Sequence, residues 1–473
     1  MHGSSHILID LAIIAILWLG VWRFKTPPGA RVGNLMAAFA LLCAAVVVLI
    51  RNPVLNPAVV ACVFLIGGAV GWIVAMRVNM LQIPAMVAFQ HGAGGVAVVL
   101  VSCVELTRDM ASLPAIGIFS GLLGIVLGGA TFSGSMVASG KLANRLKQTP
   151  TIYPGHSAML LLNVLAVIAL GIMAAMAGGS ALTYLLTGLI VASVCLGVLF
   201  SIRIGGADMP VLISFLNATA GLAAAFCGII IENRLLIACG ATVAASGSIL
   251  THVMCKAMNR DLTKLLGGSS LKHKPAQTTP HAEEVQGTAE PQTDKTDEGQ
   301  PARDPMERAV EAAREAEKVI IIPGYGMALA HAQFETVKLA DKLAKMDKSV
   351  KFAIHPIAGR MPGHMHVLLA EANADSNMLF DMDDVNNEFS QTDFVVVIGA
   401  CDVVNPAANA AEDTPISGMP ILLAHEAKHV AVCNLDERPG YSGVENPLYK
   451  NSNTIPLFGD AKATLGRLLE LLA

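Results

Sequence analysis

The chain has 473 residues, of which 54% are apolar and only 14% charged. Soluble domains carry about 25% charged residues, so the composition excludes a wholly soluble enzyme, a nucleic-acid binder with a basic face and a small disulfide-held secreted domain. The net charge of −4 divides unevenly, because residues 1–260 carry 13 Lys and Arg against 5 Asp and Glu, whereas residues 261–473 carry 19 against 31. The nine cysteines show no CxxC pair or metal-ligand spacing, so we expect no metal site.

Long apolar segments fill the first half of the chain. Most of them reach the roughly 20 residues that an α-helix needs to cross the hydrocarbon core of a membrane. They predict nine membrane-spanning helices, near residues 5–22, 34–50, 57–76, 83–103, 113–139, 157–177, 181–202, 207–231 and 235–255.

The basic residues between these segments indicate how the bundle is oriented. Alternate loops, together with the exit from the ninth helix, contain eleven Lys and Arg, whereas the other loops contain only Arg51, Arg108 and Arg234. Since basic loops stay in the cytoplasm, this asymmetry predicts an N-terminus outside and a cytoplasmic C-terminal half.

A polar segment separates two parts of the chain. Residues 265–305 contain no aromatic residue and abundant Pro, Gly, Thr and Glu, which predicts a flexible linker between a membrane domain, 1–264, and a cytoplasmic domain, 306–473. In the second domain, β-branched runs alternate with amphipathic segments, a pattern typical of a doubly wound, Rossmann-like α/β sheet. The runs predict strands at Lys318–Ile322, Val350–Ile354, Phe394–Ile398, Pro420–Leu423 and Val430–Cys433.

Glycine-rich turns follow the first two predicted strands. Gly324 and Gly326 lie in PGYGMALAHAQ, residues 323–333, where such a turn lets a pyrophosphate approach the backbone. The sixth position of that fingerprint is Leu329, so a plain tight turn explains the pattern equally well. HPIAGRMPGHMHVLLAEA, residues 355–372, sets Arg360 among glycines, which suits either a phosphate ligand or a surface turn.

Two further segments carry polar or glycine-rich candidates. In IGACDVVNPAA, residues 398–408, Asp402 and Asn405 follow a buried strand, where the ligands of open α/β sheets bind. RPGYSGVENPLY, residues 438–449, is a glycine-rich loop with two tyrosines, which fits either a loop that closes over a ligand or a solvated turn.

These motifs, together with LFGDAK and in this order after nine spans, resemble the beta subunit of proton-translocating NAD(P) transhydrogenase. The resemblance implies a Si/Re-specific enzyme of the bacterial inner membrane that binds NADP(H) on this chain. It also implies an alpha subunit that binds NAD(H), a dimer of alpha–beta units, and hydride transfer coupled to proton movement. The expected cofactor-binding residues are Gly324, Tyr325, Gly326, Met327, Gly359, Arg360, Met361, Pro362, Gly363, Gly399, Ala400, Asp402, Asn405, Asn434, Asp436, Arg438, Tyr441, Gly459 and Asp460.

The chain departs from the family where the resemblance places the NADP(H) 2′-phosphate. The family has Lys-Arg-Ser there, whereas this chain has Asn434, Leu435 and Asp436. A carboxylate repels a phosphate and suits a free ribose hydroxyl better. Three alternatives stay open: Arg438 replaces the missing cations, the site also admits NAD(H), or the change is neutral.

Ionisable and polar residues inside predicted membrane helices are functional candidates because burying them in lipid is costly. His91 lies within the fourth segment and titrates near neutrality, although a neutral His bonded to a carbonyl is the simpler alternative. The resemblance places an essential proton-channel His in this segment, and it also matches Asn217 and Ser135. Asp208 begins the eighth segment, where it could face the soluble domain or cap the helix.

These expectations combine into one main functional hypothesis and one alternative. The chain is expected to bring its nicotinamide directly against that of its partner, without a covalent intermediate or a metal. The rival is a secondary transporter or channel with a cytoplasmic dinucleotide-sensing domain. A partner with a second dinucleotide site distinguishes them, because this chain has only one.

Overall fold

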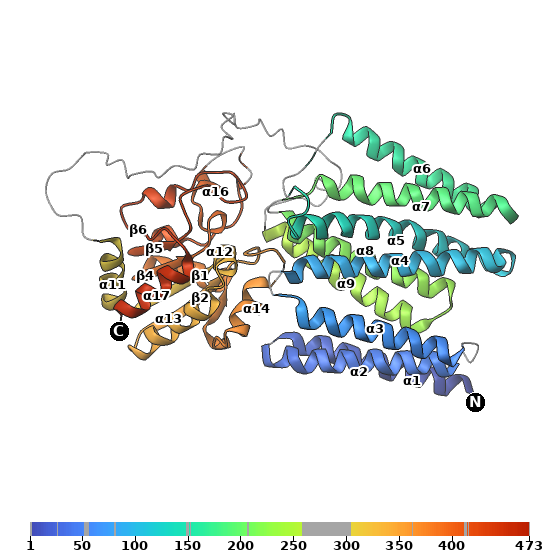
Figure 1. Ribbon diagram of the computed structural model, residues 1–473, viewed down its shortest axis with the longest axis horizontal. Coiled ribbons are helices and arrows are strands. Elements are labelled where there is room, and N and C mark those ends of the chain that lie inside the picture. Colours follow the sequence, from blue (N-terminus) through green and yellow to red (C-terminus); the bar gives the residue numbers. More distant parts are fainter. Residues whose placement is uncertain are drawn as a thin grey trace.

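The computed structural model describes residues 2–25, 27–51, 56–79, 82–147, 151, 153–205, 208–257, 304–361, 363–410, 414 and 416–472. These residues form a helical bundle and a sheet domain that lie end to end (Figure 1). Nearly all of the predicted linker, and Pro362 of the candidate site, lie outside the described residues. The predicted domain limits therefore stay predictions.

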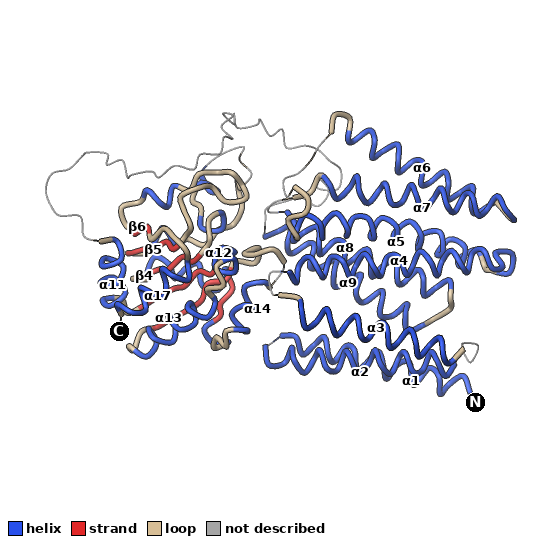
Figure 2. The backbone as a smooth tube through the Cα atoms, viewed as in Figure 1, coloured by secondary structure: helices blue, strands red, loops and turns tan. Residues whose placement is uncertain are grey.

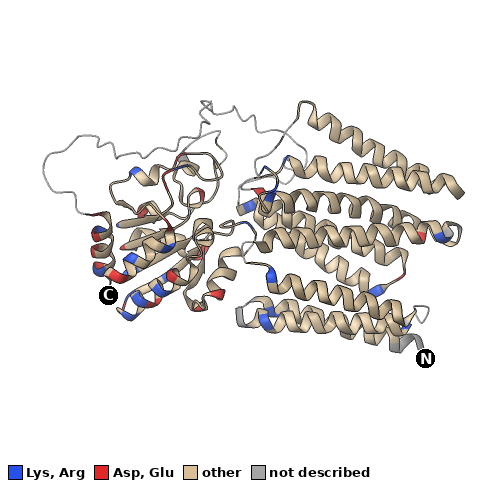
Figure 3. Cartoon of the chain, in the orientation of Figure 1, with Lys and Arg blue, Asp and Glu red and all other residues tan. Residues whose placement is uncertain are grey.

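Among the described residues, apolar helices make up the bundle, and all strands lie in the other part (Figure 2). Within the described residues, eight helices are long and apolar enough to cross a membrane, while the apolar stretch of α1, His6–Trp22, is shorter. Figure 3 shows that Lys and Arg of the bundle lie at helix ends, several of them near the sheet domain. The helices are α1 (His2–Trp22), α2 (Pro27–Arg51), α3 (Pro57–Arg77), α4 (Ile83–Asp109), α5 (Ala115–Leu142), α6 (His156–Met176), α7 (Gly179–Ile202), α8 (Met209–Ile230) and α9 (Arg234–Ala257).

Close backbone contacts hold the centre of the bundle together. Helix α5 packs against α4, α7 and α8, and α8 also packs against α9. A Cβ atom on Gly95 of α4 would lie 2.5 Å from the carbonyl oxygen of Gly128 in α5. Small residues at such crossings let membrane helices approach closely, so α4, α5 and α8 form one packed unit.

The second part is a parallel six-stranded sheet with the order β3-β2-β1-β4-β5-β6, which confirms the predicted Rossmann-like class. The predicted strand at Pro420–Leu423 is wrong, because that segment lies outside the sheet. The strands are β1 (Lys318–Pro323), β2 (Ser349–Ile354), β3 (Leu379–Asp381), β4 (Phe394–Ile398), β5 (His429–Cys433) and β6 (Thr454–Pro456). The helices are α11 (Pro305–Glu315), α12 (Tyr325–Leu329), α13 (Gln333–Lys345), α14 (His364–Glu371), α15 (Met382–Val385), α16 (Ala407–Ala410) and α17 (Ala461–Leu471).

The sheet is buried on both faces, as expected for parallel strands rich in Val and Ile. Val319 and Ile321 of β1 face a core formed with α11, α13, α14 and α17. Ile320 and Ile322 face the opposite core, formed with α15 and short 3₁₀ turns. This three-layer packing leaves the loops at the carboxyl edge free to form a site.

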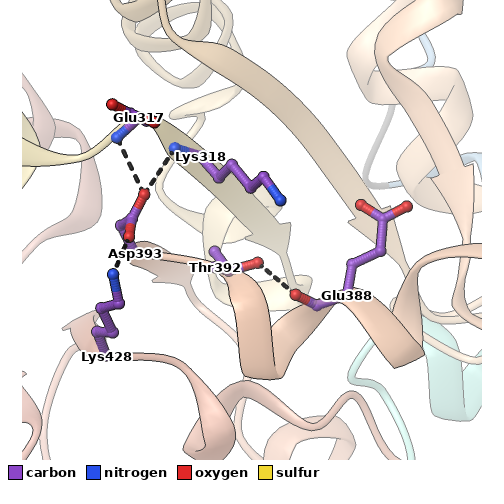
Figure 4. A network of polar contacts seen from close by, with 6 residues as sticks. All are labelled: Glu317, Lys318, Glu388, Thr392, Asp393 and Lys428. Atoms are coloured by element: carbon purple, nitrogen blue, oxygen red, sulfur yellow. Dashed lines mark hydrogen bonds and ion pairs between the residues drawn. The ribbon is translucent and has the colours of Figure 1, made fainter.

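The amino edge of the sheet is held by one carboxylate. Asp393, just before β4, accepts hydrogen bonds from the backbone N–H groups of Glu317 and Lys318 at 3.1 and 3.0 Å (Figure 4). It also pairs with Lys428, before β5, at 2.6 Å. The hydrogen bond from Lys428 and those from the backbone lower the pKa of Asp393 to about 2. The network therefore joins the starts of the central strands and stabilises the fold.

Candidate functional site

The turns after β1 and β4 are locked together at the carboxyl edge of the sheet. The N–H of Gly324 donates to the carbonyl of Ile398, and that of Gly326 donates to the carbonyl of Gly399, both at 2.8 Å. Gly399 has φ +65°, and a Cβ there would clash with the backbone nitrogen of Met327. Only glycine fits this contact, so the adjacent Ala400 and Met327 are placed firmly beside the point where the strand order reverses.

The loop between β2 and α14 is fixed by a histidine. The backbone N–H of Arg360 donates to Nδ1 of His364 at 3.1 Å, and a Cβ on Gly359 would lie 2.6 Å from the same nitrogen. Burial, and secondarily the nearby Arg360 guanidinium, lower the pKa of His364 to about 4. The ring is therefore neutral near pH 7, and its proton lies on Nε2. Gly363 takes the N-cap position of α14 with φ +73°, and Met361 precedes the undescribed Pro362.

Arg360 lies between two tyrosines from separate loops. Its guanidinium carbon is 4.5 Å from the centre of the Tyr325 ring, and its Nη2 donates to the Tyr441 hydroxyl at 2.8 Å. Burial raises the pKa of Tyr325 to about 12, although Arg360 opposes that shift. The cluster brings three predicted site residues together and offers a cation and aromatic faces to a ligand.

Asp402 holds the loop that carries Tyr441. One carboxylate oxygen accepts from the Ser442 hydroxyl at 2.6 Å and the other accepts from its backbone N–H at 3.1 Å. Burial raises the pKa of Asp402, while the bonds from Ser442 oppose that rise. Asn405 donates to the Glu445 carbonyl at 3.1 Å. Both predicted residues therefore fasten the 438–446 loop to the end of β4.

The segment after β5 contains an internal ion pair. Asp436 accepts from the backbone N–H of Arg438, and its carboxylate pairs with Nε of the same residue, both at 2.9 Å. Asn434 donates to the carbonyl of Ala400 and to the Tyr449 hydroxyl. Arg438 is thus already engaged by the carboxylate beside it.

The last two predicted residues lie between β6 and α17. The N–H of Gly459 donates to the carbonyl of Asn434 at 2.9 Å. Asp460 caps α17 by accepting from the N–H of Ala463 at 2.9 Å. Gly459 therefore supports the segment after β5, and Asp460 has a clear structural role as a helix cap.

A second polar site lies inside the bundle. The side chain of His91, in α4, lies near that of Asn217, in α8. Ser135, in α5, lies opposite the next residue of α4, because a Cβ on Gly92 would be 3.2 Å from its Cβ. The structure therefore brings together three of the four predicted proton-path residues, each from a different helix.

Asp208, the fourth, lies at the N-cap of α8 and makes no side-chain capping hydrogen bond within the described part of the chain. Three residues further on, Val211 belongs to a buried cluster against which Ile357 of the sheet domain packs. Asp208 is therefore near the junction of the two parts, and both roles predicted for it stay predictions.

Comparison with known proteins decides the family. The family model described as NAD(P) transhydrogenase beta subunit matches residues 6–471. NAD(P) transhydrogenase subunit beta of Rhodospirillum rubrum is 39% identical over 463 residues, which is 96% of each chain, and a sequence from a named strain of that species matches equally. The chain belongs to the NAD(P) transhydrogenase beta subunit family.

Membership of this transhydrogenase family favours the redox reading over the transporter with a sensing domain. The beta subunit name also implies an alpha subunit and a membrane setting. Sequence reasoning missed several residues that shape the site: Ser442, His364, Asn446 and Tyr449 hold its loops, and Ile357 contacts the bundle. The only available signal was their position within or beside the glycine-rich segments.

Proposed function

We propose that the chain binds NADP(H) at the carboxyl edge of its sheet and exchanges hydride with NAD(H) on an alpha subunit. The observation that carries this proposal is the Arg360 cluster between Tyr325 and Tyr441, beside the locked turns of β1 and β4. The nicotinamide, when bound, supplies the hydride donor or acceptor. The glycine turns would admit the dinucleotide backbone, and Arg360 would bind a phosphate.

The remaining site residues fit supporting roles in this proposal. Asp402 and Asn405 hold the 438–446 loop, whose Tyr441 would then cover the bound nucleotide. Asn434, Asp436 and Arg438 would face the ribose 2′ position, where the ion pair leaves little net positive charge for a phosphate. We therefore expect the preference for NADP(H) over NAD(H) to be weaker than a pair of free cations would give.

The bundle would supply the proton path. The imidazole of His91 can carry a proton, and its proximity to Asn217 would make the position of α8 sensitive to that charge. Because α8 begins beside Ile357 of the sheet domain, this sensitivity could bias that domain between hydride-transferring and nucleotide-exchanging states. The loop charges support an outside N-terminus and a cytoplasmic sheet domain in a bacterial inner membrane, and we propose a dimer of alpha–beta units.

The cofactor assignment is tested on the full chain in detergent, titrated with NADPH and with NADH by nucleotide fluorescence. We expect one NADPH site per chain and an affinity about tenfold to a hundredfold weaker in Arg360→Gln, which loses a charged donor. Arg314→Gln is the matched control, because Arg314 donates to a helix-end carbonyl, that of Leu471, in the same domain. Absence of NADPH binding would contradict the assignment, and unchanged affinity in Arg360→Gln would remove Arg360 from the site.

A further inference from the structure

Arg360 contacts the membrane bundle as well as the candidate nucleotide site. While Nη2 donates to Tyr441, Nη1 donates to the carbonyl oxygen of Leu142 at 3.0 Å. These partners lie 81 and 218 residues away along the chain. A single guanidinium therefore joins the loop over the sheet edge to a membrane helix.

Leu142 is the last residue of α5, and it is anchored among the helices that carry the polar site. Its side chain is buried in a cluster with Ala88 of α4 and Leu216 of α8. Ala88 precedes His91 by three residues, and Leu216 is adjacent to Asn217. A change at the end of α5 therefore acts on packing that His91 and Asn217 share.

The end of α5 is electrostatically suited to a cation. The carbonyl groups of the last helical turn carry partial negative charge and have no partner within the helix. Lys141 satisfies the equivalent groups near the end of α7, donating to the carbonyls of Ile202 and Ile204 at 2.6 and 2.7 Å. Arg360 provides the corresponding cap for α5, from the other domain.

A second contact between the two parts carries no charge. Ile357, in the same loop as Arg360, packs against the cluster formed by Val211 of α8 and by Met254 and Cys255 of α9. This apolar contact would hold the domain near the bundle even if Arg360 moved. Mutation can therefore remove the charged cap, which Arg360 provides, separately from the apolar contact, which Ile357 provides.

We propose that Arg360 is a coupling residue that links nucleotide binding to the end of α5. The proposal rests on the proposed function, because it requires a phosphate at Arg360. A phosphate would draw on the same N–H donors and would neutralise the guanidinium, and both effects weaken the bond to Leu142. Nucleotide binding thus loosens the last turn of α5.

The coupling is reciprocal. If a bound phosphate weakens the cap on α5, then any rearrangement of α4, α5 or α8 that strengthens the cap must weaken phosphate binding by the same factor. Protonation at His91 would be one input to this cap, because His91 lies one helical turn from Ala88, which packs in one cluster with Leu142. Arg360 would thereby be a positioning residue for proton coupling in addition to a nucleotide ligand.

Hydrogen exchange in the full chain, held in lipid nanodiscs, tests the coupling. The reporters are the amides of Ala143, Arg145 and Leu146, which bond to carbonyls of Ser139 and Gly140 in the last turn of α5. Saturating NADPH should speed their exchange about fivefold to thirtyfold, the range expected when a charged cap leaves a partly buried helix end. Arg360→Gln should show the faster exchange without NADPH and no further response to it.

Two variants make the result specific. Ile357→Ala weakens the apolar contact but keeps the cap by Arg360, so NADPH should still speed the exchange of the reporter amides. Arg314→Gln removes a helix-end cap elsewhere and should behave as the unmodified chain. NADPH that binds without changing α5 exchange would overturn the coupling and leave the proposed function intact. Failure of NADPH to bind, seen in its fluorescence, would overturn both.

Discussion

Ser442 offers a sharp test of how the site closes. Its hydroxyl donates to the partly buried carboxylate of Asp402 at 2.6 Å, and its backbone N–H donates to the other oxygen at 3.1 Å. Ser442→Ala deletes the first bond, and with it the bond from the Val444 N–H to the same hydroxyl, and leaves the second. A hydrogen bond to a charged group contributes about 1.5–3 kcal/mol, and each 1.4 kcal/mol is a factor of about ten. Opening of the 438–446 loop should therefore become about tenfold to a hundredfold more frequent.

The assay is the release rate of NADPH from the full chain. Stopped-flow measurements follow the fluorescence of NADPH itself after mixing with excess NADP⁺, which does not fluoresce. Ser442→Ala should speed release by the factor above, and Ser442→Thr, which keeps the hydroxyl, should restore slow release. Thr392→Val is the control, because it removes a hydroxyl that bonds the Glu388 carbonyl at the opposite edge of the sheet. Release from Ser442→Ala within twofold of the unmodified rate would refute the role assigned to Asp402 and this loop.

Three further predictions concern stability and selectivity. Asp393→Asn should lower the free energy of unfolding of the sheet domain by about 1–2 kcal/mol at pH 7, measured by urea titration. Since the pKa of Asp393 is lowered to about 2, the unmodified chain should lose this stabilisation as the carboxylate is protonated, while the pH falls from about 4 through 2. Burial lowers the pKa of His355 from 6.5 to about 4. The unfolded chain therefore binds this proton at a higher pH than the folded chain, so the free energy of unfolding should fall by up to about 3 kcal/mol as the pH drops from 6.5 to 4. His355→Gln should reduce that loss, measured by thermal unfolding at each pH. Asp436→Ser should free Arg438 and raise the NADPH-to-NADH affinity ratio about tenfold by calorimetry, and an unchanged ratio would place the ribose 2′ position elsewhere.

The sequence predicted the long elements better than the short ones. Strands β1, β2, β4 and β5 have five or six residues and are β-branched, so their pattern is clear. Strands β3 and β6 have three residues each, too few for a periodic signal. Pro420–Leu423 has a strand-like composition, but its backbone groups bond to residues outside the sheet. The N–H of Leu422 donates to the carbonyl of Val403, and the carbonyl of Ile421 accepts from the side chain of Asn386.

The candidate site was predictable where glycine was the signal. The turns at Gly324 and Gly399 stand out because close backbone approach allows no side chain. Contacts between distant residues left no such signal, and the bond from Arg360 to Leu142 depends on how the bundle and the sheet domain meet. The sequence did not predict the ion pair of Asp436 with Arg438, since spacing alone does not show whether an Arg faces its neighbour or a ligand.

In the proposed function, this chain works with an alpha subunit and couples hydride transfer to proton movement through His91. Both subunits in sealed vesicles allow one direct measurement, in which hydride transfer from NADPH to an NAD⁺ analogue is followed by absorbance and proton movement by a pH-sensitive dye. The account predicts that both signals appear together, and that His91→Ala abolishes the dye signal and alters NADPH release. Unimpaired proton movement and NADPH release in His91→Ala would contradict it.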